Sequence, residues 1–391
     1  MSQHGSSPKT ILALASAGNF SQLGARLLIS PLVPAILVAF SVSKSRIGIV
    51  LTGMWAIYAV FQYPGGTLGD LFDERRILLL SLGLTSVALF LVANSPTFLL
   101  FGLFVVFLGS GAGLYFPVAS SMLTKRFERT GQALSVMTAS GTIAGLVYPA
   151  LAGFLVVWIG WRRTLMLGAG VTFVVFVLAA LFTESPKAGN GDAAAEWLPI
   201  ERIVEILIRP GVAYTIGIAV AFSFTFQAIT SFFPTFLFEY RDLSTGAAGV
   251  AFGVVYLLSS LSQPLVGRLS DAFDRDVALF TSAILTGTGF VVLIFSRSIV
   301  GLVAGVGILG IGFSWPGVLQ ARIMDHFGDA ERGRGFGLVR AIYMLLGSVA
   351  SVVVGTLADF VGWSAAYGFV IGLMILIVVA LVVNRLLDLG L

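Results

Sequence analysis

The octapeptide GTLGDLFD at residues 66–73 recurs as GRLSDAFD at residues 267–274, an offset of 201 positions. The segment GAGLYFP at residues 111–117 likewise recurs as GIGFSWP at residues 310–316, an offset of 199. Three further glycines recur at an offset of 202, namely Gly145, Gly153 and Gly160, matched by Gly347, Gly355 and Gly362. Because these matches keep the same order at nearly the same offset, the chain is predicted to consist of two related halves.

The composition places both halves in a membrane. Of the 391 residues, 57% are hydrophobic and 11% are charged, and the mean hydropathy is +0.99. An ordinary globular chain carries about 25% charged residues, so this chain has too few charges to cover a water-facing surface. The 46 glycines fit helices that pack closely in lipid. There is no cysteine, and His4 and His326 stand apart, so no metal site, cofactor site or thiol chemistry is expected.

The apolar residues form twelve runs, each long enough to cross a bilayer as a helix. They are continuous and far longer than the strands of a membrane barrel. The fold class expected from them is an all-α integral membrane protein with twelve transmembrane helices in two six-helix halves. The predicted spans are 10–39, 47–69, 77–94, 97–124, 132–158, 163–183, 211–238, 247–270, 277–296, 299–324, 336–359 and 363–386.

A polar segment divides the two halves. We expect residues 1–184 to form the N-terminal bundle, 185–209 a cytoplasmic linker with a short amphipathic helix at 200–208, and 210–391 the C-terminal bundle. With both termini in the cytoplasm, 15 of the 23 Lys and Arg residues fall on the cytoplasmic side and six outside. The positive-inside rule therefore favours this orientation, and the location expected is the plasma membrane.

The repeated Gly-x-Leu-x-Asp loop after the second span of each half resembles the major facilitator superfamily, as do the glycine-rich fourth and fifth spans. The resemblance covers nearly the whole chain. It implies the fold of that family, two pseudo-symmetric six-helix bundles around a central cavity that opens alternately to either side of the membrane. The first loop departs from the family pattern at Leu71 and Glu74, where the family usually has a basic residue and a glycine.

The same resemblance implies a gating role for the two loops. It places Asp70 at the cytoplasmic start of the eleventh span and Asp271 at the start of the fifth, near Gly131. A carboxylate there meets the positive end of a helix dipole, and only while the cytoplasmic side is closed. The alternative is that the basic residues of these loops serve only as orientation signals. The predicted gating residues are Gly66, Asp70, Arg75, Arg76, Arg129, Gly267 and Asp271.

Arg26 is the clearest candidate for substrate binding. It lies about midway along the first span, where an arginine costs at least about 2.5–3.5 kcal/mol on insertion scales and is usually functional. Asn19, Gln22, Arg26 and Ser30 form one polar stripe on that helix. In the family, the first and seventh spans line the cavity, and the seventh carries a matching stripe at Ser223, Gln227 and Ser231. The alternative for Arg26 is a structural role.

Three further residues complete the predicted substrate site. Arg340 lies a few residues inside the eleventh span, where it either binds substrate or extends to the cytoplasmic interface. Tyr148 and Trp315 are on spans that can face the cavity, although packing is the default interpretation for aromatic residues in a chain with 32 phenylalanines.

These features predict a secondary active or facilitative transporter of a small, anionic organic solute, with the guanidinium of Arg26 as the anion ligand. One alternative is efflux of hydrophobic compounds by the same fold. A more remote alternative is a membrane sensor that does not transport. No catalytic constellation, phosphate loop or mid-span acid appears in the sequence. The expected partners are therefore a small-molecule substrate and the lipid bilayer, with no nucleic acid and no nucleotide, and the chain is expected to be a monomeric transporter rather than an enzyme.

Overall fold

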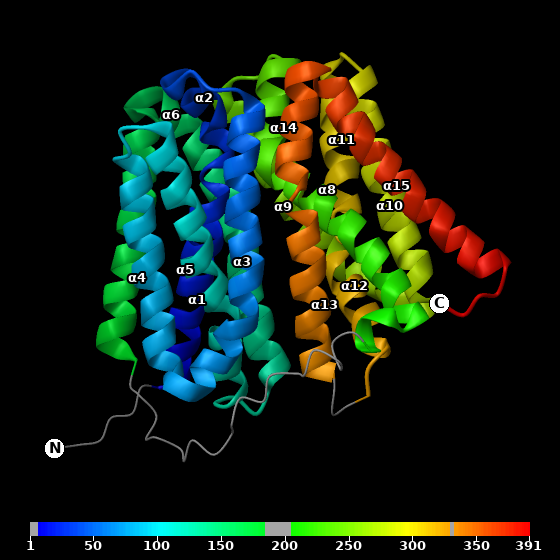
Figure 1. Ribbon diagram of the computed structural model, residues 1–391, viewed down its shortest axis with the longest axis horizontal. Coiled ribbons are helices and arrows are strands. Elements are labelled where there is room, and N and C mark those ends of the chain that lie inside the picture. The colour runs from blue at the N-terminus through cyan, green and yellow to red at the C-terminus, as the bar shows by residue number, and fades with distance from the viewer. Residues whose placement is uncertain (1–6, 184–204, 329–331) are drawn as a thin grey trace.

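The computed structural model describes residues 7–183, 205–328 and 332–391, and the side chains of residues 63–72 and 332–334 lie outside the described part. Within those limits the chain is helical, with no strand. Figure 1 shows two groups of long helices side by side, the N-terminal half in one group and the C-terminal half in the other. The predicted all-helical membrane fold with two bundles is confirmed.

The first bundle contains the six spans predicted for the N-terminal half. The first span is divided by Pro31 and Pro34, which start a short 3-10 turn and a new helix because proline cannot continue the preceding ladder of hydrogen bonds. The elements are α1 (Pro8–Leu27), η1 (Ser30–Leu32), α2 (Val33–Phe40), α3 (Lys44–Phe72), α4 (Glu74–Ala93), α5 (Phe98–Thr124) and α6 (Thr130–Phe182).

The second bundle repeats this arrangement, with its fourth and fifth spans each divided into two helices. Residues 205–208 form a helical turn before it, and the rest of the predicted linker lies outside the described residues. The elements are α8 (Pro210–Tyr240), α9 (Thr245–Ala272), α10 (Arg275–Phe295), α11 (Ile299–Gly312), α12 (Pro316–Asp325), α13 (Arg332–Gly347), α14 (Ala350–Phe360) and α15 (Trp363–Leu386).

The number of spans is consistent with twelve. Ten helical segments of the described residues are long and apolar enough to cross a membrane. One of these segments, α6, has 53 residues and covers two predicted spans, and α3 occupies one more. The break inside α6 falls at Gly160, where φ is +78°. Gly362, its counterpart at the offset of 202, has φ +100° directly before α15. Glycine adopts this conformation without the steric cost that other residues meet, so the repeated Gly-Trp pairs mark equivalent helix boundaries.

The repeated octapeptide also ends each second span in the same way. Its last residue, Asp73 in one half and Asp274 in the other, is the N-cap of the following helix. The carboxylate of Asp73 accepts a hydrogen bond from the backbone N–H of Arg75, and that of Asp274 from Val277. A carboxylate at this position satisfies an N–H group that the helix cannot pair internally.

The two bundles meet along a seam that is closed at one end. That end carries the connections at residues 41–43, 241–244 and 361–362, and we call it the outer end. The opposite end, where residues 183 and 205 lie, we call the linker end. At the outer end glycines allow backbone contact. A Cβ atom at Gly153 would lie 2.3 Å from the carbonyl oxygen of Thr245, and one at Gly355 would lie 2.5 Å from that of Lys44.

Candidate functional site

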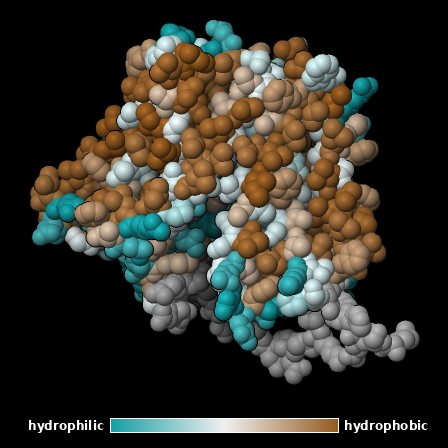
Figure 2. Space-filling model, turned by 180° about the vertical axis from the view of Figure 1, so that it is seen from behind, coloured by the Kyte–Doolittle hydropathy of each residue, from teal (hydrophilic) through white to brown (hydrophobic). Residues whose placement is uncertain are grey.

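A cavity of about 260 Å³ lies between the bundles, with walls from α1, α3, α5 and α6 on one side and from α8, α9, the junction of α11 and α12, and α13 on the other. Toward the outer end the seam is closed, and Thr52 donates a hydrogen bond there to the carbonyl of Ser348 at 2.9 Å. In the cavity wall itself, Ser260 joins the bundles by donating to the hydroxyl of Thr142 at 2.9 Å. Toward the linker end the helices separate. Added Cβ atoms at Gly131 and Gly267 would meet nothing within 4 Å. Figure 2 shows the molecule hollowed at this end, so the cavity opens there.

Arg26 lies in the wall of the cavity. Its side chain is 8% exposed, and its Nε donates a hydrogen bond to the carbonyl of Gln22 at 3.3 Å. The guanidinium carbon lies 4.0 Å from the ring centre of Tyr58 and 5.2 Å from that of Trp55. A cation over an aromatic face at these distances is attracted by the ring. No described acidic residue lies within ion-pair distance of Arg26, so its charge is available to a ligand.

Arg340 reaches the same cavity from the other bundle. The sequence left open whether it extends to the interface, and the structure places it in the cavity wall. Its guanidinium carbon lies 5.4 Å from the ring of Phe116, on α5 of the first bundle, and Tyr58 interacts electrostatically with both arginines. Its Nε is buried and has no hydrogen-bond partner among the described residues. Two cations from opposite bundles therefore flank one tyrosine.

The rest of the stripe on the first span splits into two parts. Asn19 and Gln22 line the cavity, but their amides also bind the bundle. Asn19 donates to the carbonyl of Met137 at 2.8 Å, and Gln22 donates to Ser81 at 3.1 Å while its carbonyl accepts from Thr85 at 2.8 Å. Ser30 lies outside the lining and joins the halves by donating to the carbonyl of Ser231 at 3.1 Å.

The predicted stripe on α8 does not face the cavity. Gln227 donates to Ser223 at 3.2 Å and to the carbonyl of Met344 at 3.0 Å, and the hydroxyls of Ser231 and Ser351 lie 2.7 Å apart. All of these contacts are buried within the second bundle or at its seam. They hold α8 against α13 and α14.

Tyr148 and Trp315 also lie outside the described lining. The ring of Tyr148 packs 5.2 Å from that of Phe20, and its hydroxyl is buried without a described partner. Trp315 stacks on Phe222 with ring centres 5.0 Å apart. Both aromatic residues therefore stabilise their own bundles in this conformation.

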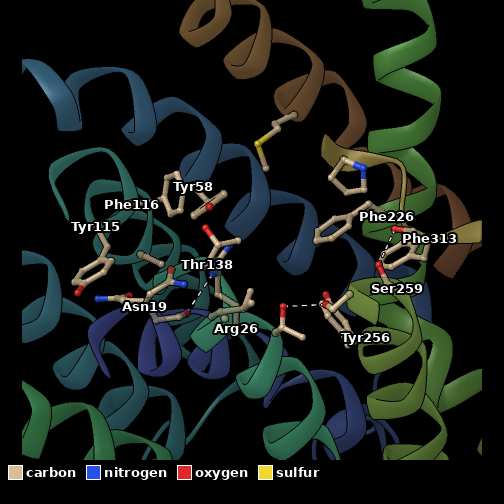
Figure 3. A pocket seen from close by; sticks show the side chains of 18 of the residues that line it. Asn19, Arg26, Tyr58, Tyr115, Phe116, Thr138, Phe226, Tyr256, Ser259 and Phe313 are labelled. Atoms are coloured by element: carbon tan, nitrogen blue, oxygen red, sulfur yellow. Dashed lines mark hydrogen bonds between the residues drawn. The ribbon is translucent and has the colours of Figure 1, made fainter. Parts of the chain in front are cut away.

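Several lining residues were not selected from the sequence. In Figure 3 those of the first bundle, such as Tyr58 and Phe116, face those of the second, such as Phe226 and Tyr256, with Arg26 between them. Periodicity alone does not separate such residues from ordinary core aromatics. The lining residues missed as site residues are Leu23, Trp55, Tyr58, Ala112, Tyr115, Phe116, Thr138, Gly141, Thr142, Phe226, Tyr256, Ser259, Ser260, Gln263, Phe313, Pro316 and Met344.

The predicted gating residues that the structure describes stay within their own bundles. Arg75 donates to the carbonyls of Ala180 at 2.7 Å and Thr183 at 2.6 Å, near the C-terminus of α6. Asp271 pairs with Arg275 at 2.9 Å. Arg76 and Arg129 are exposed, and the side chains of Gly66 and Asp70 lie outside the described residues. Contacts that form only when the linker end closes are not expected in this conformation, so the predicted gate remains a prediction.

Charged residues lock the outer end instead. Lys44, at the start of α3, lies 3.0 Å from Glu239 and 3.7 Å from Asp359, which belong to the second bundle. The carboxylate of Asp359 also accepts hydrogen bonds from the backbone N–H groups of Lys44 at 3.2 Å and Ser45 at 2.7 Å. A carboxylate of one bundle thus caps a helix of the other, where the helix dipole favours negative charge. Trp363 completes this outer lock by donating to Glu239 at 2.9 Å.

The chain is similar to several known transporters. It is 27% identical over 247 residues to the human voltage-gated purine nucleotide uniporter SLC17A9, a match that spans 59% of this chain and 56% of that protein, little more than half of either. It is 23% identical to the probable nitrate transporter NarT of Staphylococcus carnosus, over 86% of both chains. It is 25% identical to the hexuronate transporter of Bacillus subtilis, over 71% of both.

The fold is shared with solved structures as well. A bacterial homologue of the human lysosomal transporter Spinster, in an inward-facing and unoccupied conformation, superposes with a TM-score of 0.78 and 16% identity, over 96% of this chain and 95% of that one. The model of the Major Facilitator Superfamily matches residues 14–317 and again residues 239–388. The chain therefore belongs to the Major Facilitator Superfamily, whose members are membrane transporters of small solutes.

Proposed function

We propose that this transporter moves a small organic anion and that Arg26 and Arg340 bind its negative charge. The observation that carries the proposal is the unbalanced charge of the cavity. Two guanidiniums lie in its wall, and none of its described lining residues is acidic. Buried charges are normally paired, so an anionic substrate supplies the missing partner. A guanidinium also matches the planar geometry of a carboxylate or phosphate.

The relatives support an anionic substrate. Their names refer to a purine nucleotide, nitrate and a hexuronate, all of which are negatively charged at neutral pH. One of these is a nucleotide, so a nucleotide belongs among the substrates to be tested, although the sequence predicted none as a partner.

The placement of the two arginines supports transport by alternating access. Arg26 belongs to the first bundle and Arg340 to the second, so an anion bound to both links the halves. In the empty cavity the two cations repel each other, and a bound anion removes that repulsion. Binding therefore favours the approach of the bundles at the linker end. We take the linker end as the cytoplasmic side, as the positive-inside rule favours, and the membrane as the plasma membrane. In this orientation the cavity of the structure opens to the cytoplasm. Both of its walls come from one chain, which supports a monomer as the transporting unit.

Efflux of hydrophobic compounds is the second candidate, because seven of the lining residues are aromatic. In that case Arg26 would be structural, and uncharged compounds would be transported without it. The two candidates therefore differ in whether transport depends on the charge of Arg26.

The test is substrate counterflow in proteoliposomes with Arg26→Gln. We expect the loss of a charged ligand contact, about 1.5–3 kcal/mol, to weaken anion binding roughly tenfold to a hundredfold. Arg46→Gln is the matched control, because Arg46 is exposed at the outer end of α3, away from the cavity. Anion transport that is unchanged in Arg26→Gln would contradict the proposal and favour hydrophobic efflux.

A further inference from the structure

The polar side chains of the cavity are largely committed to the protein. Asn19 and Gln22 use their amides within the first bundle. On the opposite wall, Ser259 donates to the carbonyl of Phe313 at 2.9 Å and Ser260 to Thr142 at 2.9 Å. A solute rich in hydroxyl groups needs many free donors and acceptors, since each polar group left unpaired on binding costs affinity. The cavity is therefore poorly suited to a sugar acid.

Aromatic faces form a continuous row in the same cavity. Phe226 contacts Trp55 edge to face with ring centres 6.0 Å apart, and stacks on Phe313 at 5.4 Å with an angle of 2°. Phe313 in turn contacts Tyr256 at 5.8 Å. Trp55 belongs to the first bundle and the other three to the second. Figure 3 shows Phe226, Phe313 and Tyr256 together on one wall. A flat ring placed along this row gains contacts that a non-aromatic solute of the same size does not.

Two polar groups border this aromatic row. Arg26 is at one end, with its guanidinium carbon 5.2 Å from the ring of Trp55. Tyr256 borders Phe313, and it is 8% exposed with a buried hydroxyl that has no described partner. A buried hydroxyl normally has a hydrogen-bond partner, so this hydroxyl has an unused bond for a ligand group that reaches it.

We infer that the transported anion is an aromatic carboxylate: one planar ring against Phe226 and Phe313, with its carboxylate toward Arg26. The inference rests on the anion transport proposed above and specifies its substrate class. The cavity of about 260 Å³ lies just below the range of about 300–1,000 Å³ typical of drug-sized ligands, which suits a single ring. Tyr256 supplies a hydrogen bond to a polar substituent on that ring.

The test compares four anions by isothermal titration calorimetry on the purified wild-type protein: benzoate, cyclohexanecarboxylate, glucuronate and nitrate. Benzoate and cyclohexanecarboxylate share charge and approximate size, and only benzoate has a π face. We expect benzoate to bind about threefold to tenfold more tightly than cyclohexanecarboxylate, the usual gain from aromatic contact, and more tightly still than glucuronate or nitrate. This comparison needs no variant, so it holds even where a substitution impairs folding.

Two variants then locate the ring. Phe226→Leu should remove most of the preference for benzoate over cyclohexanecarboxylate, while Phe173→Leu, a lipid-facing control on α6, should leave it unchanged. Tyr256→Phe keeps the ring and should weaken 4-hydroxybenzoate, whose substituent meets the tyrosine hydroxyl, more than benzoate.

The outcomes separate the inference from the proposed function. Suppose that glucuronate or nitrate binds more tightly than benzoate and that this binding is lost in Arg26→Gln. The aromatic substrate would then be wrong, while the proposed anion transport would stand. Equal binding of benzoate and cyclohexanecarboxylate would overturn the role of the aromatic row. If Arg26→Gln bound all four anions as tightly as the wild type does, the proposed function itself would be overturned.

Discussion

The arginines of the cavity are held by aromatic rings rather than by acids. The ring centre of Tyr58 lies 4.0 Å from the guanidinium carbon of Arg26, and Tyr58 also interacts with Arg340. An aromatic ring attracts a cation without neutralising it, so both arginines keep their charge for a ligand. An acid at the position of Tyr58 would instead form a permanent ion pair and compete with the substrate.

At the scale of the residue, Arg340→Gln should weaken anion binding roughly tenfold or more, because it removes one of the two charged contacts. Arg340→Lys should recover only part of this loss, since lysine keeps the charge but not the planar, bidentate geometry. Titration calorimetry with the transported anion measures both variants. If Arg340→Gln bound the anion as the wild type does, the role of Arg340 in the site would be wrong.

Close contacts between helices set the geometry of the seam. At Gly249, on α9, a Cβ atom would lie 2.3 Å from the carbonyl oxygen of Pro149, on α6. The obstructing atom is backbone, so it cannot turn aside as a flexible side chain does. The glycines of α6 and α9 thus allow the two bundles to touch near the outer end, and they place the cavity below that contact.

At the scale of the element, Gly249→Ala should force α6 and α9 apart and destabilise this closed seam by about 1–3 kcal/mol, the usual cost of overpacking. A lower melting temperature in detergent would report it. Gly170→Ala is the matched control, since Gly170 lies on α6 with open space around its Cβ position. Equal melting temperatures for the two variants would show that the seam adapts to the added methyl group.

Across the whole molecule, closure of the outer end depends on the lock formed by Lys44, Glu239 and Asp359. It ties the start of α3 to the end of α14 through two backbone hydrogen bonds and an ion pair. These contacts exist only while the outer end is closed, so they stabilise this conformation relative to the outward-open one.

Asp359→Asn should therefore shift the population toward the outward-open form, by up to about 2 kcal/mol for a partly buried carboxylate at a helix N-terminus. The chain has no cysteine, so a single Thr138→Cys substitution in the cavity wall reports access. Its alkylation from the outer side by an impermeant reagent should become faster in Asp359→Asn.

Asp242→Asn is the control for this experiment. Asp242 lies at the same end, and its φ of 55° is one that asparagine also tolerates. An alkylation rate that did not differ between Asp359→Asn and Asp242→Asn would contradict the outer lock.

Hydrophobic length and internal repetition suffice to predict the membrane fold, the two bundles and the boundaries at Gly160 and Gly362, because these depend on local chain properties and on insertion into lipid. They also single out Arg26, since a charge at mid-span is costly whatever surrounds it. Which polar face meets the cavity depends instead on neighbouring helices. Ser223, Gln227 and Ser231 form a stripe as regular as that of Asn19 and Gln22, yet they face α13 and α14. The aromatic row and the outer lock likewise join residues far apart in the chain, and only the packing of the two bundles brings them together.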